Sequence, residues 1–167
     1  MNDYCLILRT LCCGFANFPD RVEVERVNPL EYGVRCAPAD QGKLIGKSGA
    51  NAAVLRGLLN HRLAMDGERP VSVTIMTGSE QVPSVPEWTK QDWNGNDAEA
   101  LEDYFFDVLH YVTGKPHDIQ MAETDDSSKI VLPGSALPTA LQFSIRTLAK
   151  AVGRVRGRKV VLCFDER

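Results

Sequence analysis

The 167-residue chain is long enough for one or two ordinary domains, and 44% of its residues are hydrophobic and 25% charged. These proportions are typical of a globular protein and exclude an extended disordered polypeptide. No apolar run is long enough to cross a bilayer, and Arg9 interrupts the apolar stretch that a signal peptide would need, so we expect no membrane role and a cytoplasmic location. The formal net charge of -3 disfavours strong non-specific binding to a polyanion. Any nucleic-acid site must therefore be local.

The cysteines and histidines show no pattern of a disulfide framework or a metal site. The five cysteines are odd in number and lack C-x-x-C spacing, and the three histidines are scattered. We expect reduced, mostly buried thiols and neither a metal nor another cofactor. No histidine lies near a serine or cysteine nucleophile in a recognisable motif, so the sequence indicates that the protein is not an enzyme.

The first half of the chain reads as an alternation of helical and extended segments. Apolar spacing of 3 to 4 residues predicts helices, and strict alternation predicts half-buried strands. In chain order, we expect a helix over 3–14, strands over 21–27 and 33–37, a short helix over 38–45, a loop over 46–49, a helix over 50–67 and a strand over 71–75.

Proline, tryptophan and little periodicity mark residues 79–97 as a linker. We expect Trp88 and Trp93 to anchor this linker onto a domain rather than to stack on bases. The pattern then begins again, with Asp97 as the expected N-cap of the next helix. In order, we expect a helix over 98–113, strands over 119–121 and 130–132, a helix over 138–152 and a strand over 160–164.

The two halves align as an internal repeat. One set of residues aligns at a separation of 97, namely Pro19, Val22, Val24 and Val34 with Pro116, Ile119, Met121 and Val131. A second set aligns at a separation of 90, namely Arg56, Leu58 and Gly67 with Arg146, Leu148 and Gly157. The sequence therefore predicts a duplication whose second copy has lost seven residues between the positions of Ala37 and Asn51. The lost stretch covers the short helix and the glycine loop.

The loop Gly46-Lys47-Ser48-Gly49 has two positions without a Cβ atom, which would let a nucleotide backbone lie against the main chain. Free N–H groups at the start of the following helix would favour a phosphate there. An ordinary helix connection with Ser48 as N-cap is the alternative interpretation. A P-loop is disfavoured, because Gly42 to Ser48 is one residue short of that motif and follows a helix rather than a strand.

The pattern Asp40-x-Gly42-Lys43-x-Ile45-Gly46-Lys47-x-Gly49, with Arg56 on the next helix, resembles the small bacterial type II KH RNA-binding proteins of the KhpA family. The resemblance extends over residues 3–76. Together with the internal repeat, it implies an α+β fold of two tandem KH type II-like modules (αββααβ), the second degenerate and lacking the GxxG loop. The implied domains are a KH domain over 1–78, a linker over 79–97 and a degenerate KH-like domain over 98–167.

This resemblance implies that the loop clamps single-stranded RNA in a shallow groove beside the strand at Val34. The candidate RNA-binding residues are Gly46, Lys47, Ser48, Gly49, Lys43, Ile45 and Asn51. In this scheme the lysines add charge, Ile45 and Val54 form apolar walls, and Asn51 reads a base edge. Arg56 has the counterpart Arg146 in a copy without the loop, so a shared structural role is preferred over a phosphate contact.

Family members act in post-transcriptional control and associate with themselves or with a second KH protein, so the degenerate copy could replace such a partner within one chain. A protein-interaction scaffold and a ribosome-assembly or ribosome-associated factor remain open as other functions. The basic run from Arg146 to Lys159 is either an auxiliary phosphate patch or a solvated helix face.

Overall fold

A computed structural model describes residues 3–77, 98–114, 119–123, 127–133, 137–157 and 159–165. The expected linker, with Trp88 and Trp93, and the expected N-cap Asp97 lie outside these residues. Mixed helices and strands occur in both halves, as expected for an α+β protein.

The first half contains the expected order of elements. They are α1 (Tyr4–Cys13), β1 (Glu23–Asn28), β2 (Glu31–Cys36), α2 (Pro38–Ile45), α3 (Ala50–Met65) and β3 (Ser72–Thr77), with short 3-10 turns at Pro19–Arg21 and Lys47–Gly49. Asp3 caps α1 by accepting a hydrogen bond from the Leu6 amide, which stabilises the helix start. The sheet order is β1-β2-β3, with β1 antiparallel and β3 parallel to β2. The helices cross over between β2 and β3, as a parallel pair requires.

The second half repeats this arrangement, and its described residues contain no counterpart of α2. Its elements are α5 (Ala98–Thr113), β4 (Gln120–Glu123), β5 (Ser127–Pro133), α6 (Thr139–Arg156) and β6 (Lys159–Asp165). The sheet order β4-β5-β6 again joins an antiparallel pair to a parallel pair. Gly67 and Gly157 both adopt left-handed backbone after the long helix, at the separation of 90 that the sequence predicts.

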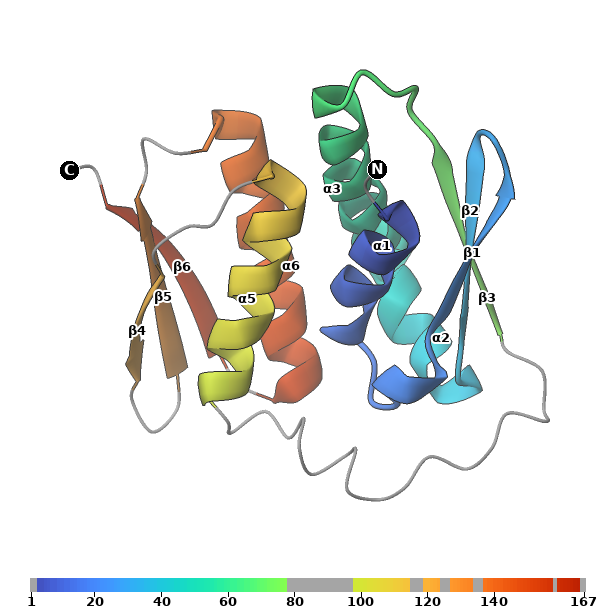
Figure 1. Ribbon diagram of the computed structural model, residues 1–167. Helices are drawn as coiled ribbons and strands as arrows, with labels where there is room; N and C mark the ends of the chain where they lie inside the picture. The colour runs from blue at the N-terminus through green and yellow to red at the C-terminus, as the bar shows by residue number, and fades with distance from the viewer. Residues whose placement is uncertain are drawn as a thin grey trace.

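The molecule has four layers, with the two sheets outside and the helices between them (Figure 1). Helix α1 contacts α5 and helix α3 contacts both α5 and α6, so corresponding helices of the two halves meet. Their apolar faces form one buried cluster that includes Leu8, Leu59, Phe105 and Ile145. Burial of apolar surface is the main favourable term in folding, so each half covers the helix face that the other would expose.

Close contacts join the two halves at the middle of the helix layer. The Tyr104 hydroxyl of α5 donates a hydrogen bond of 2.8 Å to the carbonyl oxygen of Leu11 in α1. A Cβ atom built on Gly14, which follows α1, would collide with the ring of Tyr104. Only glycine fits at this position, because its missing side chain makes room for the tyrosine ring.

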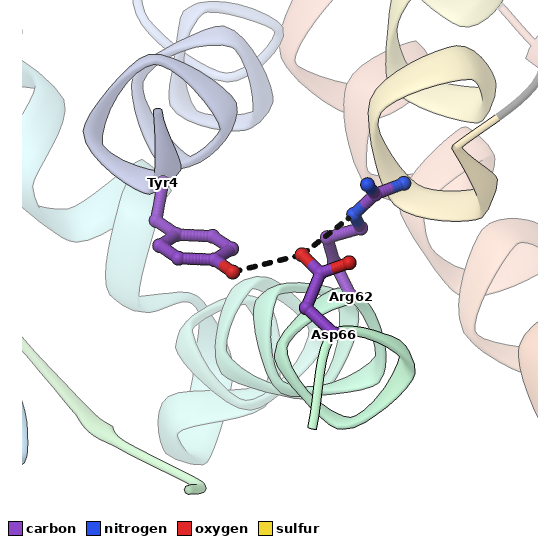
Figure 2. A network of polar contacts seen from close by, with 3 residues as sticks. All are labelled: Tyr4, Arg62 and Asp66. Carbon is purple, nitrogen blue, oxygen red and sulfur yellow. Dashed lines mark hydrogen bonds and ion pairs between the residues drawn. The ribbon is translucent and has the colours of Figure 1, made fainter. Parts of the chain in front are cut away.

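A polar network joins α1, α3 and the end of α5 (Figure 2). One carboxylate oxygen of Asp66 accepts hydrogen bonds from the Tyr4 hydroxyl at 2.8 Å and from Nε of Arg62 at 3.2 Å. The Arg62 guanidinium lies against Gly114, directly after α5. A cation at the C-terminal end of a helix interacts favourably with the helix dipole, so this arginine stabilises the junction.

None of the described helices combines the length and apolar composition needed to cross a membrane. All five cysteines are free, and Cys12 and Cys36 are buried. Burial, with a smaller effect of the Asp40 charge, raises the pKa of the Cys36 thiol to about 11. This thiol is therefore protonated at neutral pH and is a poor nucleophile.

Candidate functional site

The glycine loop links the end of α2 to the start of α3, and three of its four residues have positive φ. Gly46 has φ 74° and ψ 173°, Ser48 has φ 56° and ψ 27°, and Gly49 has φ 75° and ψ 15°. The Gly46 amide donates to the Gly42 carbonyl oxygen at 2.8 Å, and the Gly49 amide donates to the Gly46 carbonyl oxygen at 3.2 Å. The turn is therefore a defined structure with its own hydrogen bonds.

The two glycines are needed for different reasons. A Cβ atom on Gly46 would lie within 2.7 to 2.9 Å of three Asn51 atoms, so the position has no room for a side chain. A Cβ atom on Gly49 would meet nothing within 4 Å. Gly49 is favoured by its left-handed backbone, which glycine adopts without the cost that other residues incur. The open space above Gly49 is where a ligand backbone can approach the main chain.

Asn51 closes the loop from the first turn of α3. Its Nδ2 donates a 2.7 Å hydrogen bond to the Lys43 carbonyl oxygen in α2. The bond fixes the end of α2 against the start of α3. This bond uses one of the two N–H groups of the Asn51 amide, so a base edge would be read by the side-chain carbonyl oxygen or by the second N–H.

The tip of the loop faces solvent. Lys47, Ser48 and Ala50 are exposed, while Lys43, Ile45 and Asn51 are half-buried. The N-cap of α3 is Gly49, and it makes no side-chain hydrogen bond to the helix. Ser48 is therefore not the N-cap of α3, and that part of the alternative interpretation is wrong. The first N–H groups of α3 receive no cap from Ser48 or Gly49, and the helix dipole places partial positive charge there.

A buried aspartate fixes the other end of α2, and the sequence analysis gave it no role. Asp40 is 0% exposed, and its carboxylate accepts hydrogen bonds from the backbone amides of Asn17 at 2.9 Å and Phe18 at 3.0 Å. Hydrogen bonds to a charged acceptor are stronger than neutral ones. These bonds tie the start of α2 to the chain segment after α1, while the Asn51 bond holds its end. Helix α2, which leads into the loop, is therefore held at both of its ends. The signal available in the sequence was a lone acidic residue in the first turn of an otherwise apolar and basic segment.

The residues expected to line the groove differ in their exposure. Val54 and Ile45 are half-buried and available as apolar walls, but Val34 is fully buried beneath the helices. Helix α2 packs against α3 and β3. The strand beside α2 is therefore β3, an edge strand, rather than the central strand β2 that carries Val34.

The corresponding helix start in the second half has no such turn. Pro138 precedes α6 with φ -58° and ψ 149°, and Leu137 before it is 6% exposed. The Gln142 side chain donates to the Leu137 carbonyl oxygen at 3.0 Å. At the separation of 90, the buried Leu137 corresponds to the exposed Lys47, and Pro138 corresponds to the exposed Ser48. Ala136, which corresponds to Gly46, lies outside the described residues.

Arg56 and Arg146 occupy corresponding helix positions but have different surroundings. The Arg146 guanidinium carbon lies 4.8 Å from the ring centroid of Phe164 in β6, a cation–π contact that stabilises the second half. Arg56 is exposed on α3. This contact gives Arg146 a structural role in the second half, whereas a role shared with Arg56 stays a prediction.

One curated relative is similar to the first half of this chain. It is the RNA-binding protein KhpA of Lactiplantibacillus plantarum, 27% identical over 84 residues. The match covers 48% of this chain and 98% of that protein. No protein-family model matches the chain, and no solved structure does.

Proposed function

We propose that this chain binds single-stranded RNA through a KH-type module in its first half, with the loop Gly46-Lys47-Ser48-Gly49 holding the sugar-phosphate backbone. The observation that carries the proposal is the exposed turn before α3, which has two glycines and no side-chain cap. Four nucleotides are the usual length that a GxxG loop clamps. The similarity to an RNA-binding protein over the same half supports the same function.

In this proposal the backbone contact comes first and the base contacts follow. A phosphate rests above Gly49, where no Cβ atom stands in the way, and accepts hydrogen bonds from the first amides of α3. Lys47 adds a charge at the exposed tip, and Lys43 adds one from the half-buried end of α2. Bases then contact Ile45 and Val54, and the Asn51 carbonyl oxygen reads an amino group. The biological role we propose is post-transcriptional regulation.

We further propose that the second half acts as a built-in partner for the first. Its helices α5 and α6 cover the apolar faces of α1 and α3, and corresponding helices meet as they do in a two-fold dimer. Its own helix start lacks the glycine turn and does not clamp RNA in this way. The full chain is then a monomer in solution at micromolar concentration. A tight dimer through α1 and α3, measured by solution mass, would contradict this arrangement.

Replacing Lys47 and Ser48 by aspartate tests the loop. We expect RNA affinity to fall at least tenfold, because two carboxylates replace a cation and a hydroxyl beside a phosphate, while thermal stability changes little. Asp is among the residues that tolerate the left-handed backbone found at Ser48. The matched control is Ala64→Asp with Arg69→Asp, which changes the net charge by the same amount as the loop variant. Both positions are exposed, with Ala64 in the last turn of α3 and Arg69 just after the helix. Unchanged RNA binding by the loop variant would refute the loop assignment and favour a protein-interaction scaffold.

A further inference from the structure

The second half carries an exposed aromatic side chain in line with exposed cations. Phe143 of α6 is 73% exposed, and Lys150 and Arg154 of the same helix are exposed as well. With 3.6 residues per turn, positions seven and eleven residues after Phe143 return to nearly the same face of the helix. The opposite face, with Leu141, Ile145, Leu148 and Val152, is buried in the core. Folding therefore uses the buried face of α6 and leaves the aligned residues free.

The cations continue from the helix onto the following strand. A shallow depression of about 500 Å³ is lined by Lys150, Arg154 and Lys159, with Gly153, Gly157 and Val160 between them. Gly157 has φ 69°, and this left-handed turn brings the start of β6 beside the end of α6. We call Phe143, Lys150, Arg154 and Lys159 the α6 stripe. No carboxylate lines the depression, and within the described part of the chain no ion pair involves these three cations.

The stability of helix α6 does not by itself explain why all four residues of the α6 stripe are present. Cations in the last turn of a helix interact favourably with its dipole, which accounts for Arg154. Lys150 lies further from the helix end, and Lys159 belongs to the strand. Phe143 stands at the other end of the stripe, where neither the dipole nor the core requires an aromatic ring. Surface phenylalanines are common singly, so the informative feature is the alignment of this one with three unpaired cations.

We propose that the α6 stripe is a second contact surface for single-stranded RNA. The ring of Phe143 stacks on a base, and Lys150, Arg154 and Lys159 hold phosphates, the combination that single-strand binders use. Helix α3 begins and helix α6 ends toward the lower end of Figure 1, so the glycine loop and the cations lie toward the same end of the helix layer. One RNA strand can then contact both, which raises the affinity for long RNA without a second loop.

Fluorescent oligouridylates of two lengths test this proposal. The short probe has about five nucleotides, close to the number that a GxxG loop clamps, and the long probe has about 20. We expect Phe143→Ala to lower affinity for the long probe about fivefold or more, and affinity for the short probe to stay unchanged. Lys150→Ala with Arg154→Ala should also weaken long-probe binding, and should reduce the logarithmic salt slope by about 1.4, since each phosphate contact on a single strand contributes about 0.7.

Two matched variants control for general surface changes. Phe106→Ala removes an exposed ring from α5, and Arg69→Ala with Lys129→Ala removes two exposed cations elsewhere. Neither should alter long-probe affinity. An abasic oligomer of the long length separates stacking from charge, because Phe143→Ala should not affect its binding.

Unchanged long-probe affinity in Phe143→Ala, or an equal loss on the abasic oligomer, would overturn the α6 stripe as an RNA surface. The loop is tested separately by the Lys47→Asp and Ser48→Asp variant, which should lose short-probe binding. If that variant keeps the short probe while Phe143→Ala still weakens the long one, the proposed loop function fails and the α6 stripe stands.

Discussion

The starts of α3 and α6 differ although the sheets and helices around them correspond. Helix α3 follows an exposed turn with left-handed backbone at Ser48 and Gly49, whereas α6 follows a buried leucine and a proline in extended backbone. Two corresponding helices, packed in the same way, therefore begin with different turns. The comparison teaches that the fold is set by the apolar faces of the long helices, while the ability to hold a ligand backbone depends on a few residues before α3.

The largest loss of stability should come from substitution of Asp40, which anchors α2 in the first half. The second half has no corresponding aspartate. Asp40→Ala leaves the amides of Asn17 and Phe18 without their buried acceptor. We expect a loss of about 3 kcal/mol in unfolding free energy, measured by urea denaturation, and weaker RNA binding as α2 loosens. Asp20→Ala, at an exposed position, is the control. Stability within experimental error of the unmutated protein would show that α2 does not depend on this carboxylate.

The packing between the halves can be broken at Gly14. Gly14→Ala places a methyl group in the space of the Tyr104 ring and should cost about 2 kcal/mol. Tyr104→Ala frees that space, so the two substitutions should be strongly non-additive in a double-mutant cycle. Additive losses would indicate that the ring does not occupy this position. A single unfolding transition in every variant is expected, because the two halves share one core.

The turn itself can be made less favourable at Gly49. Gly49→Ala puts a Cβ atom on left-handed backbone at a cost of about 1 to 2 kcal/mol, although no neighbour is within 4 Å. RNA affinity should fall by more than the loss of folded protein accounts for, because the methyl group occupies the space proposed for the phosphate. A variant that loses stability but binds RNA normally would remove Gly49 from the site.

The smallest change in stability, a gain rather than a loss, should come from substitution of Gly57 in the middle of α3. A Cβ atom at Gly57 meets nothing within 4 Å, and the corresponding residue of α6 is Thr147. Gly57→Ala should raise the unfolding free energy by about 0.5 to 1 kcal/mol, because alanine favours helix more than glycine. RNA affinity should be unchanged. A loss of stability would mean that α3 needs glycine here for a reason other than space.

The sequence predicted the order of helices and strands well, because each segment buries one face and shows the matching period. Helix 38–45 is found at the expected bounds, and the expected strands differ from the observed ones by a few residues. The exposed loop was also predictable, since glycines between two helical segments favour a turn.

Side-chain partners could not be predicted in the same way. The Asp40 carboxylate bonds to amides more than twenty residues away, and the Asn51 amide bonds to a carbonyl oxygen on another helix. Such contacts depend on the three-dimensional approach of segments, which periodicity does not encode. The same holds for Val34, whose alternating pattern predicted a strand but not its full burial.

The most direct test of the loop's role is the set of backbone amide NMR shifts on adding a short oligouridylate of about four nucleotides, the length that a GxxG loop clamps. The proposed function predicts large shifts for Lys47 through Asn51 and none for Thr139 through Gln142 at the start of α6. Shifts confined to other surfaces, with the amides of Lys47 through Asn51 unmoved, would contradict it.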